Sequence, residues 1–194
     1  MDGAVLSGIT ICEYLWIAFA VIWALWAFGT KETKTRQSIR SSIPYLIISS
    51  AAATAMFNHH LPRWLNVRVL PQGSWIANLG IAVTLAGLLI SVWARASLGR
   101  NWSGTVTVKV GHQLIRSGPY RWVRHPIYSG LVLATIGTAT NIGQVRGLIA
   151  VALIYIAFIV RTSVEERFMV SIFGEKYHEY RKTSGRMIPG LTDY

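Results

Sequence analysis

The residues best suited to chemistry lie in the stretch SGPYRWVRHPIYSG, residues 117–130. Pro126 suits the first position of a helix, because its missing N–H would find no partner there, and His125 then occupies the N-cap. A helix N-terminus carries about half a positive charge, so the N–H groups of Ile127 and Tyr128 could bind a carboxylate or a phosphate. A capped helix with a tyrosine at a membrane surface explains the same residues, and both interpretations stay open.

The same stretch places aromatic side chains next to a turn. Gly118 and Pro119 together are a strong turn signal, and Tyr120 and Trp122 beside them could stack on a flat ring. An interfacial belt of aromatic residues, with arginines that reach lipid phosphates, accounts for these residues equally well. By itself this motif does not distinguish a ligand site from a membrane anchor.

A second group of chemically capable residues lies in RTSVEERF, residues 161–168. Arg161 and Glu165 are four residues apart and share one face of a helix, whereas Glu166 lies on an adjacent face. These charges could form a simple surface salt bridge. Acidic residues close to a membrane boundary are costly, however, and often mark a functional site.

The composition indicates a membrane protein. The chain has 194 residues, of which 52% are hydrophobic and 14% are charged, and its mean hydropathy is +0.40. A soluble domain carries about 25% charged residues. The single cysteine, Cys12, excludes an intramolecular disulfide. The adjacent His59 and His60 would point in different directions on a helix, so no metal site is predicted.

Five apolar stretches could cross a membrane as helices. They comprise residues 11–28, 43–57, 75–98, 127–142 and 147–160. The last continues without a helix breaker into an amphipathic stretch, so this helix is expected to leave the membrane intact and to end at Gly174. The sequence therefore predicts an all-α integral membrane protein with about five transmembrane helices. We expect a single domain, 1–194, in which residues 11–98 provide the first three spans and residues 99–194 form a functional core with spans four and five and a C-terminal helix.

The positive charges predict how this bundle is oriented. Sixteen of the 19 lysines and arginines fall in the segments 31–42, 95–126 and 161–194, which the five spans place on one side. Lysines and arginines concentrate on the cytoplasmic side of membrane proteins, so a multi-pass protein with a cytoplasmic C-terminus and active site is expected. The net charge of +11 then serves orientation and attraction to anionic lipid headgroups, and neither nucleic acid nor an obligate protein partner is predicted.

These motifs together predict one kind of ligand, because all of them fall on the same side of the membrane. The helix N-terminus would bind a carboxylate, the aromatic turn a planar ring, and Glu165 a positive charge or ribose hydroxyls. S-adenosylmethionine carries all of these groups. A cofactor site for this molecule is therefore expected in the cytoplasmic C-terminal region.

The two blocks HQLIRSGPYRWVRHPIYSG and RTSVEERFMVSIFGEKYHEYRK resemble the isoprenylcysteine carboxyl methyltransferase family of integral-membrane methyltransferases, and look most like its small microbial members. The resemblance covers residues 112–189. It implies a cofactor site between the loop before the fourth span and the C-terminal helix, and Arg161 as the residue that holds the substrate carboxylate and acts with Glu165 in catalysis. The implied cofactor-binding residues are His112, Gln113, Leu114, Ile115, Tyr120, His125, Pro126, Ile127, Tyr128, Glu165 and Glu166.

The resemblance implies methyl transfer from S-adenosylmethionine, with S-adenosylhomocysteine as product, to the carboxylate of a membrane-resident isoprenylated cysteine. Eukaryotic members carry a longer acidic run where this chain has residues 163–166, and additional N-terminal spans, so the methyl acceptor stays open. A phospholipid amine or a thiol is an alternative acceptor. A reductase of the sterol-reductase type that uses NADPH is an alternative enzyme, since it shares parts of these motifs.

Overall fold

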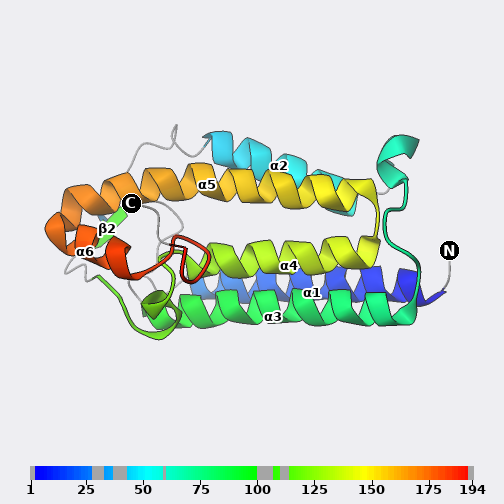
Figure 1. Ribbon diagram of the computed structural model, residues 1–194, viewed down its shortest axis with the longest axis horizontal. Coiled ribbons are helices and arrows are strands. Elements are labelled where there is room, and N and C mark those ends of the chain that lie inside the picture. The colour runs from blue at the N-terminus through cyan, green and yellow to red at the C-terminus, as the bar shows by residue number, and fades with distance from the viewer. Residues whose placement is uncertain are drawn as a thin grey trace.

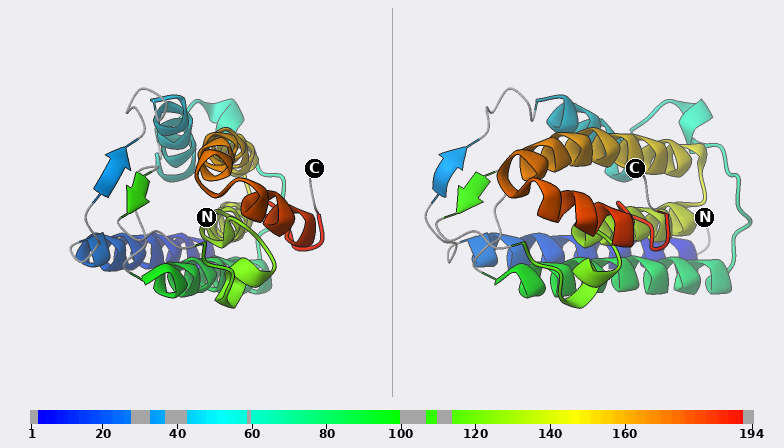
Figure 2. Two further views of the ribbon diagram at one scale, coloured as in Figure 1. Left: turned by 90° about the vertical axis from the view of Figure 1, so that its left-hand side faces the viewer. Right: turned by 60° about the vertical axis from the view of Figure 1, so that its left-hand side comes forward.

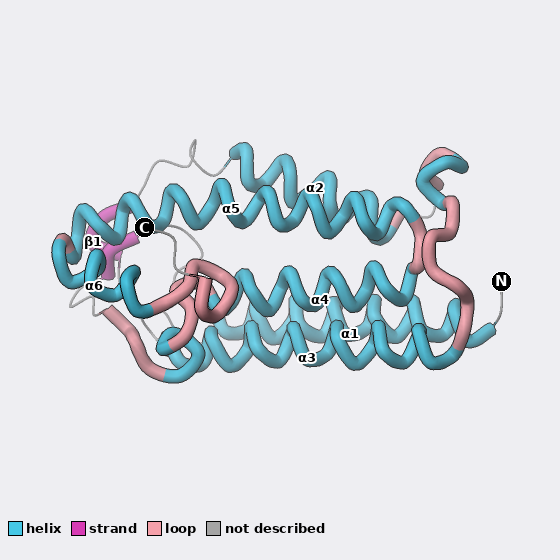
Figure 3. Tube along the Cα trace, viewed as in Figure 1, coloured by secondary structure: helices cyan, strands magenta, loops and turns pink. Residues whose placement is uncertain are grey.

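The computed structural model describes residues 3–27, 33–36, 43–58, 60–99, 107–109 and 114–191. The helices are α1 (Gly3–Ala27), α2 (Ile43–Phe57), α3 (Ser74–Leu98), α4 (Pro126–Ile142), α5 (Val145–Phe173) and α6 (Glu175–Thr183), with the short 3-10 helices η2 (Arg63–Asn66) and η4 (Gly118–Arg121). The strands β1 (Thr33–Arg36) and β2 (Thr107–Lys109) form one antiparallel pair. Helices dominate the described chain (Figure 3).

Helices α1 to α5 lie side by side along one axis (Figure 1). Helices α1, α3 and α4 pack together, α2 packs along α5, and contacts between α4 and α5 join the two groups. Figure 2 shows α2 and α5 above α1, α3 and α4, with the β1–β2 pair and α6 at the same end of the bundle. That end therefore holds the N-terminus of α4 and the C-terminal part of α5, where both sequence motifs lie.

Helices α3 and α4 approach each other closely because small residues line their contact. A side chain at Gly87 would overlap backbone atoms of Gly130 and Ala134. Close backbone approach of this kind lets helices associate in a membrane through packing and interhelical hydrogen bonds. Ser91 adds such a bond, because its hydroxyl lies 3.0 Å from the carbonyl oxygen of Ile127. The first turn of α4 is thereby held firmly on α3.

Polar side chains also tie α1 to this pair. The indole Nε1 of Trp16 donates to Thr138 Oγ1 at 3.0 Å, and the hydroxyls of Thr138 and Thr84 are 3.1 Å apart. The bonds join α1, α4 and α3 in an otherwise apolar region. Burying these groups without partners would be costly, so the three helices have a defined register.

Among the described residues, three helices are long and apolar enough to cross a membrane: Gly8–Trp26, Ser74–Leu98 and Val145–Phe173. Helix α2 has 15 residues and α4 has 17, so both are shorter than these three helices and are not among the candidate spans. Helices lie at all five predicted stretches, and α5 ends before Gly174 as expected. Helix α1 begins at Gly3 and not at residue 11, because helical structure continues beyond the most apolar part of this stretch. The β1–β2 pair was not predicted, because its strands have only four and three residues and lack an apolar alternation.

Large apolar side chains cover the outside of the bundle. Contiguous exposed apolar surface on this scale is unusual for a soluble protein and suits contact with lipid. The exposed residues include Ile17, Val21 and Leu25 of α1, Leu46 and Ile47 of α2, Leu85 and Leu89 of α3, and Leu148 and Ile156 of α5.

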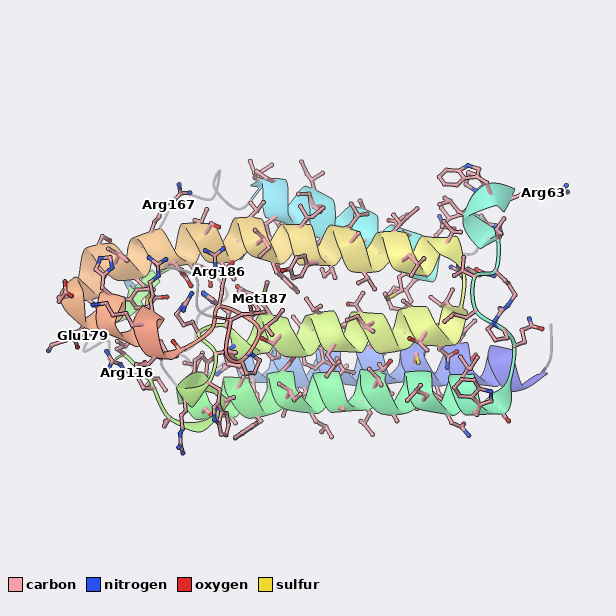
Figure 4. The ribbon with its side chains drawn as sticks, in the orientation of Figure 1. Arg63, Arg116, Arg167, Glu179, Arg186 and Met187 are labelled. Carbon is pink, nitrogen blue, oxygen red and sulfur yellow. The ribbon has the colours of Figure 1, made fainter. Side chains whose placement is uncertain are left out.

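Charged side chains gather at the two ends of the bundle. Arg116, Arg167, Arg186 and Glu179 lie at the α6 end, and Arg63 lies at the other end (Figure 4). The distribution agrees with the unequal charge of the two sides that the sequence predicts.

At the end of the bundle away from α6, buried Arg146 closes the C-terminus of α2. Its Nη1 donates to the carbonyl oxygens of Met56 at 3.0 Å and of Asn58 at 3.1 Å. Helix C-termini leave carbonyl groups without intrahelical partners. Arg146 therefore stabilises the C-terminus of α2, in addition to contributing a positive charge to this end of the bundle.

Candidate functional site

The N-terminus of α4 is built as the HP dipeptide predicts. Pro126 is the first helical residue, His125 is the N-cap, and no side chain caps this turn within the described part of the chain. A helix start of this kind is suited to an anionic ligand group, because the first N–H groups have no intrahelical acceptor. His125 itself is 9% exposed, so its imidazole lies inside the protein.

The segment after α6 holds the backbone before α4 in place. The N–H of Arg124 donates to the carbonyl oxygen of Gly185 at 2.8 Å, and the N–H of His125 donates to that of Arg186 at 3.0 Å. The Ser129 hydroxyl donates to the carbonyl oxygen of Met187 at 2.6 Å, and Figure 4 shows Arg186 and Met187 beside the start of α4. The C-terminal segment is thus part of the framework that positions His125.

Glu165 of α5 accepts hydrogen bonds from two other residues of the predicted site. Its Oε1 accepts a hydrogen bond from the Tyr128 hydroxyl at 2.7 Å and another from Arg161 Nε at 2.7 Å. Its Oε2 lies 3.5 Å from His125 Nδ1. The Glu165 side chain keeps 20% of its surface exposed, more than that of the neighbouring Glu166.

Glu166 faces a different set of partners. Its Oε1 accepts a hydrogen bond from Arg124 Nε at 2.7 Å and lies 3.3 Å from His125 Nε2. Its Oε2 lies 3.6 Å from Arg181 Nε and 3.8 Å from Arg186 Nη2. The Glu166 side chain is only 5% exposed and lies among cations of the protein itself.

His125 lies between these two carboxylates. Burial alone would lower the pKa of His125, but hydrogen bonds with Glu165 and Glu166 outweigh burial and raise this pKa above its ordinary value. The protonated imidazole can donate from both ring nitrogens, one toward each carboxylate. It thereby links α4 to α5 at two adjacent positions.

The predicted aromatic turn forms η4, which packs against α3 and is joined to α6 by a hydrogen bond. Tyr120 is buried and its carbonyl oxygen accepts a hydrogen bond from the Tyr180 hydroxyl, whereas Trp122 is half exposed. Burial raises the pKa of Tyr180 to about 12, so its hydroxyl stays protonated and able to donate. The Arg116 guanidinium donates to the carbonyl oxygen of Lys176 and lies 5.2 Å from the Tyr180 ring.

A column of rings leads from α2 into the site. The Tyr45 and Phe158 centroids are 6.1 Å apart, those of Phe158 and Tyr128 are 4.6 Å apart, and those of Tyr128 and His125 are 5.8 Å apart, all in stacked arrangements. The Arg161 Cζ lies 5.4 Å from the Tyr45 centroid. Residues of α2, α4 and α5 therefore meet at this point.

The structure brings several of the predicted site residues into one cluster. Its members are His125, Tyr128, Arg161, Glu165 and Glu166, and Pro126 and Ile127 start the helix beside it. Leu114 and Ile115 are half-buried in the segment that leads to Arg116, and Tyr120 is joined to α6 by a hydrogen bond. His112 and Gln113 lie outside the described residues.

The sequence analysis missed three residues of this region. Arg124 directly precedes His125 in the motif, so its position could have suggested a role. Tyr45 and Phe158 lie in apolar stretches in which no local signal distinguishes them from lipid-facing or core residues.

Comparisons with known proteins find similarity to one family. Residues 79–171 match the family described as "Isoprenylcysteine carboxyl methyltransferase (ICMT) family". The match includes most of α3, all of α4 and nearly all of α5.

Individual relatives carry the corresponding names. The protein-S-isoprenylcysteine O-methyltransferase B of Arabidopsis thaliana is 28% identical over 150 residues, which are 74% of this chain and 76% of the relative. The protein-S-isoprenylcysteine O-methyltransferase of Tribolium castaneum is 30% identical over 128 residues, which are 64% of this chain and 46% of the relative. The chain thus corresponds to three quarters of the plant protein but to less than half of the insect protein.

A solved structure, that of the eukaryotic intramembrane Ras methyltransferase ICMT, is also similar. It superposes with a TM-score of 0.56 at 25% identity, over 79% of this chain and 55% of the other. The arrangement of the helices is therefore shared with a membrane enzyme that is larger than this chain.

Proposed function

We propose that this chain is a member of the isoprenylcysteine carboxyl methyltransferase family and transfers a methyl group from S-adenosylmethionine to the carboxylate of an isoprenylated cysteine at a membrane. The observation that carries the proposal is the environment of Glu165. This side chain is partly exposed, and its carboxylate accepts hydrogen bonds from Tyr128 and Arg161 beside the N-terminus of α4, which no side chain caps within the described residues. One site thereby offers an anion-binding helix start, aromatic rings and a carboxylate.

The described residues fit a sulfonium nucleoside. When bound, S-adenosylmethionine supplies an electrophilic methyl group on a positively charged sulfur. The first turn of α4 would bind the carboxylate of the donor, and Glu165 would bind its positive charge or its ribose hydroxyls. The family resemblance implies that five further residues would complete this site: His112, Gln113, Leu114, Ile115 and Tyr120.

Glu166 supports this site through contacts with residues of the protein itself. Because its carboxylate contacts Arg124 and His125, it holds the N-cap residue and the C-terminal segment against α5. Its contribution to donor binding is therefore indirect, through the position of His125.

Arg161 would position the methyl acceptor. A carboxylate with a pKa of about 4 is ionised at neutral pH, so the reaction needs no general base. Its main requirements are alignment and exclusion of water, which can lower a barrier by about 7–11 kcal/mol. The bond from Arg161 Nε to Glu165 partly neutralises the guanidinium, so that the acceptor carboxylate is oriented without being held too tightly to react.

The surrounding helices would accommodate the isoprenoid tail. We assign membrane crossings to all five long helices, including the shorter α2 and α4, and place the α6 end in the cytoplasm. Each buried CH2 of a lipid chain contributes about 0.8 kcal/mol, so an isoprenylated acceptor is already concentrated in the bilayer. Residues 99–194 would form the methyltransferase core beside the first three spans.

Binding of S-adenosylhomocysteine to the purified protein in micelles tests the donor site. We expect calorimetry to detect binding in the wild type and in Glu179→Gln, an exposed control on α6, and a strong loss in Glu165→Gln. Absence of wild-type binding, or quenching by NADPH in its place, would overturn the proposal.

A panel of acceptors tests the substrate class. Methylation of a prenylcysteine is expected, with Arg161→Ala impaired mainly in the acceptor step. Methylation of phosphatidylethanolamine or of a small thiol in its place would reassign the acceptor.

Labelling with a membrane-impermeant maleimide tests the orientation. His178→Cys lies on the exposed side of α6 and Arg63→Cys at the other end, while Cys12 is buried and should contribute little background. In inverted vesicles the first variant should react and the second should not.

A further inference from the structure

We propose that Tyr45 of α2 is a positioning residue that fixes the guanidinium plane of Arg161 for the methyl acceptor. The inference deepens the proposed function and rests on it. It gives α2 a part in the reaction, although α2 lies outside the family match at residues 79–171.

The contact joins two helices at the rim of the site. Arg161 Cζ lies 5.4 Å from the centroid of the Tyr45 ring, within the range of a cation–π interaction. Tyr45 is half-buried and Arg161 is buried, so the contact is partly removed from water, where such interactions are stronger. Figures 1 and 2 show α2 running along α5, as the contact requires.

Among the contacts of Arg161, two restrain its guanidinium in different ways. The bond from Nε to Glu165 is within α5, since the residues are four apart, and fixes one edge of the guanidinium. The Tyr45 ring approaches from another helix and restricts rotation of the guanidinium about that edge. A planar guanidinium binds a carboxylate in a fixed geometry, so its orientation affects how the acceptor is presented.

The Tyr45 ring is itself held from behind. It stacks on Phe158, which is 2% exposed, and Phe158 stacks on Tyr128. The Tyr128 hydroxyl in turn donates a hydrogen bond to Glu165, the residue assigned to binding of S-adenosylmethionine. Because the hydrogen bond between Tyr128 and Glu165 does not involve Tyr45, a change at Tyr45 should affect the reaction of the methyl acceptor more than the binding of S-adenosylmethionine.

The test compares Tyr45→Leu, which removes the ring, with Tyr45→Phe, which keeps it. We expect Tyr45→Leu to lower kcat/KM for a prenylcysteine acceptor on the order of 5- to 30-fold, while the Kd for S-adenosylhomocysteine stays within about twofold. Tyr45→Phe should retain most of the activity. Tyr155→Leu is the matched control, because Tyr155 is an exposed aromatic residue of α5.

A double-mutant cycle with Arg161→Gln shows whether Tyr45 acts through Arg161. In that background, measured with enough enzyme to detect the slow reaction, Tyr45→Leu should have almost no further effect on kcat/KM. Retained S-adenosylhomocysteine binding shows that a variant is folded. If Tyr45→Leu loses this binding, Tyr45→Met, which can still pack on Phe158, takes its place.

Three outcomes would overturn the inference: an unchanged kcat/KM in the folded ring-removal variant, an equal loss in Tyr45→Phe, or an undiminished effect in the Arg161→Gln background. Failure of the proposed function would look different, because the wild type would then neither bind S-adenosylhomocysteine nor methylate the acceptor.

Discussion

Replacement of Glu166 tests whether the two adjacent carboxylates of α5 have different tasks. Arg124 Nε lies 2.7 Å from Glu166 Oε1, and the two side chains are 0% and 5% exposed. Removal of one partner from a buried ion pair leaves the other charge uncompensated and costs about 3–5 kcal/mol. We therefore expect Glu166→Ala to lower the free energy of unfolding by about this amount.

The loss should be visible as a change in thermal unfolding in micelles. For a chain of this length, 1 kcal/mol corresponds to about 2–4 °C in the unfolding midpoint, so Glu166→Ala should lower the midpoint by about 6–20 °C. Glu179→Ala is the matched control, because Glu179 is exposed on α6. Its effect should stay within about 0.5 kcal/mol, as for most surface substitutions.

Comparison with the neighbouring carboxylate completes the test. Glu165→Gln should lose donor affinity and shift the midpoint less than Glu166→Ala, because the Glu165 side chain is 20% exposed and a glutamine can still accept hydrogen bonds. A Glu166→Ala midpoint within about 2 °C of the wild type would refute the reasoning. It would mean that Arg124 does not depend on Glu166 as its buried counter-charge.

Three further predictions concern stability. The folded-state pKa of His125 is raised, so the stabilisation from its protonation is complete below the unfolded pKa of about 6.5 and is lost as pH rises through the folded pKa. The difference in thermal unfolding midpoint between wild type and His125→Asn should therefore shrink as pH rises through that range. A difference that stays constant with pH would contradict this prediction. Gly87→Val should cost about 1–3 kcal/mol or more through overlap with Ala134, measured by thermal unfolding against the exposed control Leu89→Val, and equal midpoints would be the contrary result. Arg146→Ala should cost about 1–3 kcal/mol because carbonyl groups at the end of α2 lose their donor, and an unchanged midpoint in the same assay would count against this capping role.

The helices could be predicted closely from the sequence because their signals are local. Apolar length defined α2 at Ile43–Phe57, the glycine at position 174 ended α5, and the HP dipeptide placed the start of α4. The β1–β2 pair could not be predicted in this way, because its seven residues acquire their structure from each other across the chain.

Part of the site could be predicted as well. The spacing of Arg161 and Glu165 indicated that they share a helix face, and they form the expected ion pair. That Tyr128 donates to Glu165, however, depends on how α4 meets α5, since these residues are 37 positions apart. Hydropathy identifies both helices but does not define their rotation or relative height.

The sequence by itself determined where the helices lie, which end of the bundle carries most of the positive charge, and which two motifs contain the candidate site residues. Only the tertiary structure decided that Glu165 faces Tyr128 and Arg161 while Glu166 faces Arg124, and that α2 contributes Tyr45. The physical reason is that capping and hydropathy act between neighbours in the chain. The different partners of the two adjacent carboxylates are instead defined by helix packing, which brings together residues far apart in the chain, such as Arg124 and Glu166, 42 positions apart.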